Sequence, residues 1–216
     1  MACRGSALHE IKSGVGVLLP KPLLEAGDDP NDARAVIPGL ARLGTGAAKD
    51  KLAGLTGPKN PESLMQPAIQ ALAELGDRWY CPVMLDLAQQ NAGYSRMIAL
   101  RGAGYLCGEK AIPLTLRLLN SADQSLRYEL AYALGNTHAR DAVPILSDFL
   151  ADRDENVRRA AVDALATLTH RSQEPGIASL EAAEQTRRAW MAWWSGYGRR
   201  AKIYGPEDCA AYFLGQ

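Results

Sequence analysis

The sequence has few of the residues that build metal sites or disulfide scaffolds. It holds 4 cysteines and 3 histidines among 216 residues, and its closest cysteines, Cys81 and Cys107, are far apart. A thiolate zinc site needs closely spaced pairs, and a disulfide scaffold needs a higher cysteine density. The histidines His9, His138 and His170 are equally scattered. We therefore predict no metal site, no cofactor and no catalytic residue.

An excess of charge of one sign is missing as well. Lys+Arg 24 against Asp+Glu 24 gives a formal net charge of zero, with a sequence pI of about 6.8. A neutral chain has no overall field to attract nucleic acid or an anionic membrane. The composition therefore predicts no nucleic-acid partner, although a local basic patch is compatible with it.

Long apolar runs are also missing. A membrane-spanning helix needs about 20 apolar residues, and the longest candidate here, 15–20, is far shorter. The first residues include His9, Glu10 and Lys12 in place of a hydrophobic signal core. We expect no membrane insertion and a cytoplasmic location, or a periplasmic or secreted one if a signal peptide has been removed. With 47% hydrophobic residues, the chain can still bury a core.

A period of 31 residues runs through the middle of the sequence. Its plainest columns are the prolines Pro82, Pro113 and Pro144 and the arginines Arg96, Arg127 and Arg158. Apolar columns such as Leu72, Ala103, Leu134 and Leu165 share the interval. Independent columns with one period indicate internal structural repeats.

Each repeat has the pattern of two helices. Asp123 is the predicted N-cap of one helix, which ends near 135–136, and Pro144 occupies the first turn of the next. A single helix pair cannot cover its apolar face, so the repeats must stack. We expect Leu134 and Phe149 in the shared core.

The pattern resembles HEAT repeats, particularly the short form of phycobilisome-lyase-like repeat proteins. The stretches Ala-Leu-Gly-Asn at 133–136, Ala-Val-Pro-Ile-Leu at 142–146 and Val-Arg-Arg-Ala-Ala at 157–161 carry the resemblance. It is good over 62–170 and weaker over 31–57. It implies an all-α fold, a right-handed α-solenoid of stacked antiparallel helix pairs.

The predicted organisation is a single solenoid domain, 1–216, with a degenerate N-terminal part (1–60), clear repeats (61–170) and a C-terminal capping helix with a tail (171–216). A helix is expected from Ser179, with Trp190, Trp193 and Trp194 on one face. We interpret these tryptophans as a cap on the exposed end of the stack. The alternative is an aromatic cage for a ligand.

The enzymatic branches of this family use residues that this sequence lacks. Alkylpurine DNA glycosylases are basic along the concave face, whereas this chain is neutral. Deoxyhypusine hydroxylase uses several His-Glu dyads as iron ligands, and only His9-Glu10 occurs here, outside the clear repeats. We therefore predict a non-catalytic scaffold for protein–protein interaction or complex assembly. The alternative is a lyase-like or maturation factor that handles a cofactor covalently attached to a partner protein.

The predicted binding surface lies on the second helices, which usually line the concave side of a solenoid. The side chains expected to contact a protein partner are Asp86, Gln89, Arg117, Asn120 and Asp148. Their mixed charges suit a protein better than a polyanion. A merely solvated helix face is the alternative.

The arginine column has a structural interpretation. Each arginine is expected to bond loop carbonyls or an acid such as Asp123 or Asp154, with a phosphate-binding stripe as the alternative. Gly102 and Gly104, inside a predicted helix, indicate a close approach of another helix.

Two cysteines provide a geometric test. Cys81 begins the helix predicted over 80–90, and Cys107 follows the next helix, 94–106. Antiparallel helices joined by a short loop should bring the two thiols close together. We expect reduced, buried thiols, as in the cytoplasm; a bonded pair would point to an oxidising compartment.

Overall fold

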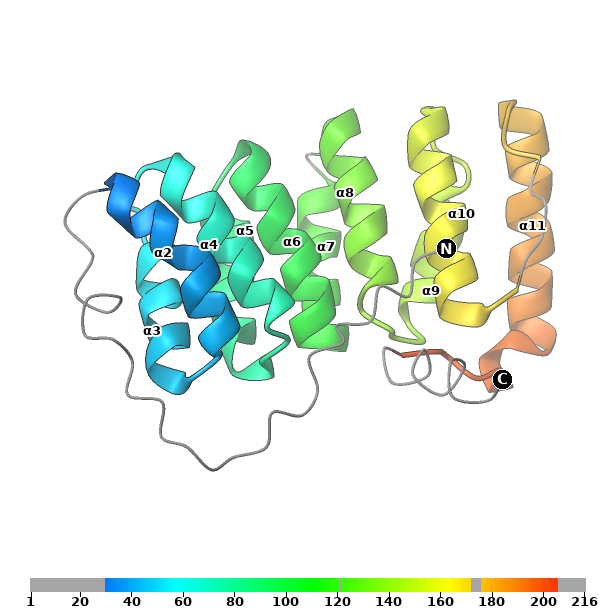
Figure 1. Ribbon diagram of the computed structural model, residues 1–216. Coiled ribbons are helices and arrows are strands. Elements are labelled where there is room, and N and C mark those ends of the chain that lie inside the picture. Colours follow the sequence, from blue (N-terminus) through cyan, green and yellow to red (C-terminus); the bar gives the residue numbers. More distant parts are fainter. Residues whose placement is uncertain (1–29, 121, 172–175, 206–216) are drawn as a thin grey trace. The chain divides into compact units, whose positions relative to one another are not determined.

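The computed structural model describes residues 30–120, 122–171 and 176–205. The chain divides into two compact units, an N-terminal unit (2–102) and a C-terminal unit (103–216). Every regular element of the described residues is helical, and none is a strand (Figure 1). The all-α prediction is confirmed. None of the described helices is long and apolar enough to cross a membrane.

The N-terminal unit is built from antiparallel helices. They are α2 (Pro30–Leu43), α3 (Gly46–Leu55), α4 (Glu62–Glu74), α5 (Cys81–Gln90) and the first part of α6 (Gly93–Cys107). Gly44, with φ +57°, ends α2, and the Thr45 hydroxyl caps α3 by accepting from the Ala48 amide at 3.3 Å. Helices α2, α3 and α4 pack on one another, and Leu40 and Leu52 are fully buried between them.

A short turn joins α4 to α5 and is fastened to α3 by two polar contacts. Asp77 accepts from the Lys49 ammonium at 2.6 Å and from the Trp79 amide at 3.0 Å. The Tyr80 hydroxyl donates to Asp50 at 2.8 Å. Hydrogen bonds from Lys49 and then from the Trp79 amide hold the pKa of Asp77 below its ordinary value.

The C-terminal unit continues the helix pairs. Its helices are the end of α6, α7 (Ile112–Leu119), α8 (Gln124–Gly135), α9 (Ala142–Phe149), α10 (Glu155–Thr169) and α11 (Leu180–Gly196). Helix α8 packs against α10, and α9 contacts α8, α10 and α11. The helices α4, α6, α8 and α10 begin at residues 62, 93, 124 and 155, so the 31-residue period is the period of the first helices.

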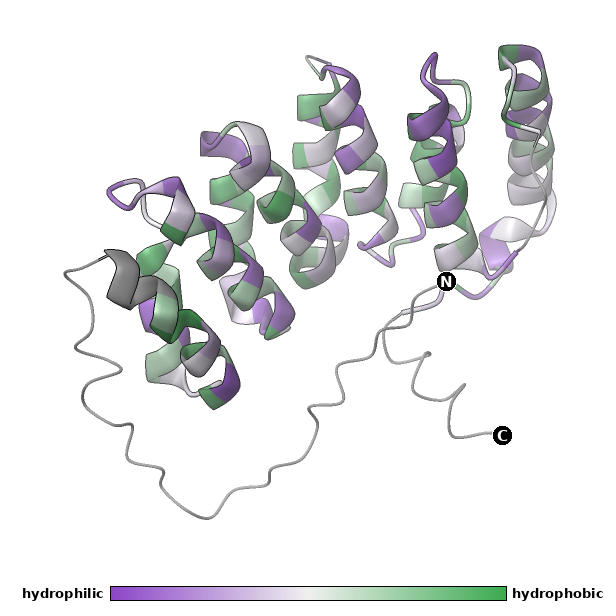
Figure 2. Ribbon diagram, turned by 45° about the horizontal axis from the view of Figure 1, so that its top comes forward, coloured by the Kyte–Doolittle hydropathy of each residue, from purple (hydrophilic) through white to green (hydrophobic). Residues whose placement is uncertain are grey.

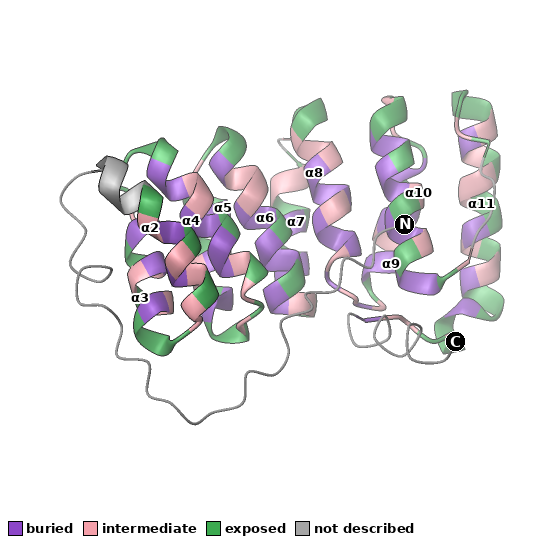
Figure 3. Ribbon diagram, viewed as in Figure 1, coloured by how far each residue is buried: buried purple, intermediate pink, exposed green. Residues whose placement is uncertain are grey.

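Caps and core follow the prediction. The Asp123 carboxylate accepts from the Leu126 amide at 2.8 Å, which makes it the N-cap of α8. Leu134 and Phe149 are buried, as expected. Apolar residues run in strips along the helices (Figure 2), and buried residues concentrate on the sides where neighbouring helices pack (Figure 3).

Glycines permit close helix contacts. A Cβ at Gly104 would overlap the carbonyl oxygen of Ala133 on α8, and one at Gly135 would lie 2.8 Å from the Cβ of Ala164 on α10. A Cβ at Gly102 would lie 3.1 Å from the Cβ of Ala73. The predicted close approach is confirmed.

The expectation of reduced thiols is wrong. Among the described residues no cysteine is free, because Cys81 and Cys107 are each disulfide-bonded. Disulfides persist in oxidising compartments, so the cysteines no longer support a cytoplasmic location. That the two thiols pair with each other stays a prediction. Cys3 and Cys209 lie outside the described residues.

Candidate functional site

The five predicted partner-binding residues are divided between the units. Asp86 and Gln89 belong to α5 in the N-terminal unit, whereas Arg117, Asn120 and Asp148 belong to the C-terminal unit. The Asp86 carboxylate accepts from the amide group of Gln90, one turn further along α5. Only the last three therefore belong to one unit.

A run of alternating charges extends that surface onto α11. The Glu184 carboxylate accepts from Arg187 Nε at 2.7 Å and from Arg188 Nε at 2.9 Å. Arg187 also reaches Asp148 at 3.4 Å, and the Asp148 side chain is 75% exposed. The hydrogen bonds from Arg187, then from Arg188, lower the pKa of Glu184 to about 2. Arg187 is therefore held mainly by Glu184, and the Asp148 carboxylate stays accessible.

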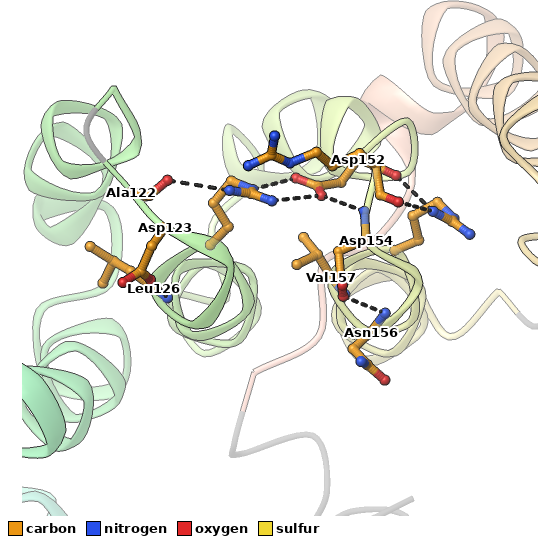
Figure 4. A network of polar contacts seen from close by, with 10 residues as sticks. Ala122, Asp123, Leu126, Asp152, Asp154, Asn156 and Val157 are labelled. Atoms are coloured by element: carbon orange, nitrogen blue, oxygen red, sulfur yellow. Dashed lines mark hydrogen bonds and ion pairs between the residues drawn. The ribbon is translucent and has the colours of Figure 1, made fainter.

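The arginine column is structural where the C-terminal unit contains it (Figure 4). Arg127 binds Asp152 through two nitrogens at 2.7 and 3.2 Å and donates to the Ala122 carbonyl at 3.3 Å. The hydrogen bond to Asp152 raises the pKa of Arg127. The acid is Asp152, where we expected Asp123 or Asp154.

Arg158 is the second member and is 3% exposed. It donates to the backbone carbonyls of Asp152 at 2.8 Å, Arg153 at 3.1 Å and Ile177 at 2.8 Å. Its guanidinium therefore connects two loops through these hydrogen bonds. Because it is buried, it is not accessible to a phosphate. In the N-terminal unit, the buried Nε of Arg96 has no hydrogen-bond partner.

Sequence reasoning missed a cluster at the ends of α8 and α10. His138 and His170 follow these helices with φ of +48° and +49°. The His138 Nδ1 lies 2.7 Å from the Tyr204 carbonyl oxygen, and the His170 ring stacks on the Tyr204 ring at 3.6 Å. The Tyr204 amide donates to the Leu168 carbonyl at 2.9 Å. These contacts fix the chain that follows α11, and only the fold brings them together.

The three tryptophans of α11 lie close together. Trp190 and Trp194 are 2% and 6% exposed, and Trp193 packs edge-on against Trp190 at 5.4 Å. The Arg171 guanidinium lies over the Trp193 ring at 4.7 Å. That these tryptophans cap the stack stays a prediction.

Neither His138 nor His170 fits an iron site that is built from His-Glu dyads. Ala139 and Arg171 follow His138 and His170, so neither forms a His-Glu dyad. Within the described ranges no group of three or more His, Cys, Asp or Glu side chains could hold a metal ion. The dyad His9-Glu10 lies outside those ranges.

Comparisons with known proteins show what parts of this chain are similar to. Residues 111–193 match the family model described as HEAT repeats. The resemblance to HEAT repeats is confirmed over these residues. Among curated proteins it is similar to deoxyhypusine hydroxylase of Bos taurus, with 29% identity over 127 residues. That match covers 54% of this chain and 41% of the relative, so the chain spans about two fifths of the relative's length.

Among solved structures, the chain is similar to human deoxyhypusine hydroxylase in complex with glycerol. The identity is 17% and the TM-score 0.29, with 80% of this chain and 83% of that chain covered. The prediction of a non-catalytic scaffold is overturned by the curated relative, which is an enzyme. The lyase-like or maturation-factor alternative falls with it. Both were inferred from the repeat pattern and from the enzyme residues that the sequence lacks, and a repeat fold does not determine activity.

Proposed function

We propose that this chain binds the protein substrate in an enzyme system of the deoxyhypusine hydroxylase kind. The observation that supports the proposal is the similarity to that enzyme over 127 residues. The described residues offer no group for a metal. The role proposed for the C-terminal unit is recognition of the protein substrate.

The surface proposed for recognition is the second-helix side of the C-terminal unit. It carries Arg117, Asn120 and Asp148, with Arg187 beside Asp148. Charges of both signs complement a protein surface and discriminate against wrong partners. Deoxyhypusine is a lysine-derived residue that bears amines, and the exposed Asp148 carboxylate is the group that would receive an ammonium. A single domain over 1–216 and a cytoplasmic location stay proposals, the latter set against two disulfide-bonded cysteines.

Calorimetric titration tests the proposal. The full chain is titrated with one purified protein in two forms, carrying either deoxyhypusine or the unmodified lysine. We expect tighter binding of the deoxyhypusine form. Asp148→Asn should reduce that preference by a factor of about 1.4 to 5, because an exposed ion pair contributes about 0.2–1 kcal/mol.

The matched control is Asp163→Asn, an exposed carboxylate on the first helix α10. It should leave both affinities unchanged. Equal binding of the two forms would contradict the proposal, and so would equal effects of the two variants.

A further inference from the structure

One segment of this neutral chain has a charge of a single sign. Between residues 185 and 206 there is no aspartate or glutamate. The five cations of this segment are Arg187, Arg188, Arg199, Arg200 and Lys202. Local charge of one sign can bind a polyanion even when the whole chain is neutral, because screening limits each interaction to about 8–10 Å.

Within this segment, the two arginines of α11 already bind acidic side chains. Glu184 accepts from both Arg187 and Arg188. Arg199 and Arg200 lie in the turn after α11, and both side chains are exposed. The Lys202 ammonium lies over the Tyr204 ring, 5.1 Å from its centroid. We name residues 197–200, which carry Arg199 and Arg200, the Tyr-Arg loop.

Arg140, from the loop between α8 and α9, fixes the conformation of the Tyr-Arg loop. Its Nη1 donates to the carbonyls of Gly198 at 3.2 Å and Arg199 at 2.6 Å, and its Nη2 donates to the Ala201 carbonyl at 2.6 Å. These carbonyls are turned toward Arg140, so the loop is ordered before any ligand arrives. Less conformational entropy is then lost on binding.

The tryptophan rings of α11 lie directly against the same loop. A Cβ at Gly198 would lie 2.6 Å from Cε3 of Trp194 and 2.9 Å from Cζ3 of Trp193. Only glycine lets the backbone lie directly on these rings. The neighbouring Tyr197 side chain is left 80% exposed. A large aromatic ring held in solvent beside two exposed arginines is unexplained by packing.

We propose that the Tyr-Arg loop binds single-stranded nucleic acid. Arg199 and Arg200 would contact phosphates, and the ring of Tyr197 would stack on a base, the combination by which single strands are bound without sequence preference. An acidic peptide could use the two arginines but gives no role to the exposed ring face. The expectation of no nucleic-acid partner rested on the charge of the whole chain, and this loop departs from that average.

Fluorescence anisotropy with a labelled oligo-dT of about 15 nucleotides tests the proposal, using the full chain at several salt concentrations. Two phosphate contacts predict a slope of log K against log[salt] of about −1.4, since each contributes about −0.7 on single strands. Replacing both arginines (Arg199→Ala with Arg200→Ala) should bring the slope near zero. Tyr197→Ala should weaken binding about fivefold or more with the slope unchanged, because stacking is not ionic.

The matched control removes two exposed arginines elsewhere in the unit, Arg153→Ala with Arg159→Ala. It changes the net charge equally and should leave the slope unchanged. Equal effects of the two double variants would overturn the proposal by showing non-specific attraction. Tighter binding of a labelled polyglutamate peptide than of the oligonucleotide would overturn it in favour of an acidic protein partner. The proposal would also be overturned if the wild-type chain, shown to be helical by circular dichroism, did not bind the oligonucleotide at low salt.

Discussion

Three glycine-to-alanine substitutions should affect stability in a fixed order, because the glycines differ in what a new methyl group would contact. Gly104 lies in α6 against the backbone of α8, and Gly135 ends α8 against α10. Gly54 lies in α3, and a methyl group added there would have nothing within 4 Å. We expect Gly104→Ala to cost most, Gly135→Ala to cost less, and Gly54→Ala to stabilise.

The magnitudes follow from the contacts. At Gly104 the methyl would overlap the Ala133 carbonyl oxygen and lie 3.1 Å from its carbonyl carbon, so α8 itself must move. Overpacking costs about 1–3 kcal/mol, and the gain in helix propensity is about 1 kcal/mol. A cost near the upper end gives a net loss of about 2 kcal/mol. At Gly135 the neighbour is the Ala164 methyl at 2.8 Å, and the net loss should be about 1 kcal/mol.

Urea denaturation followed by circular dichroism measures these differences. The two destabilised variants should have lower midpoints at an unchanged slope, because the surface exposed on unfolding stays the same. Gly54→Ala should gain about 0.5–1 kcal/mol. If Gly104→Ala were as stable as the wild type, α6 and α8 could not approach as closely as described. A loss at Gly54 equal to that at Gly104 would show that backbone conformation, and not contact, decides the outcome.

Three further predictions concern single sites. Leu134→Ala should lower the free energy of unfolding by about 2–5 kcal/mol in the same assay; an unchanged midpoint would contradict its burial. Burial and the Asp50 hydrogen bond raise the pKa of Tyr80 to about 12. Stability should therefore be complete below about pH 10 and fall toward pH 12, and Tyr80→Phe should remove this fall. Mass spectrometry after non-reducing digestion should recover a peptide joining Cys81 to Cys107; other partners would refute the predicted hairpin.

The helices could be predicted because the forces that place them are local or periodic. The arginine column at 96, 127 and 158 lies in the first turns of α6, α8 and α10. Asp123 was predicted as an N-cap from its place before an apolar pattern, and it caps α8. Capping and amphipathic burial depend on residues a few positions apart, which the sequence displays directly.

The acidic partner of Arg127 could not be predicted from the repeat period. Asp123 and Asp154 were the acids nearest to the arginine column, but each carboxylate accepts from amides of its own helix. An N-cap requires little additional ordering, so it competes well against a distant guanidinium. Arg127 then binds Asp152, which no periodic column marked.

The Tyr-Arg loop could not be predicted from the repeat period either, because distant residues position it. Its carbonyls are bound by Arg140, a residue more than 50 positions earlier, and its Gly198 rests on the rings of α11. The net charge did not indicate this loop either, because 24 cations and 24 anions sum to zero over the whole chain. In the folded chain, Asp152 binds Arg127 and Glu184 binds Arg187, whereas Arg199 and Arg200 are exposed. A balance of charges in the sequence therefore excludes a global field, but it does not exclude a binding site.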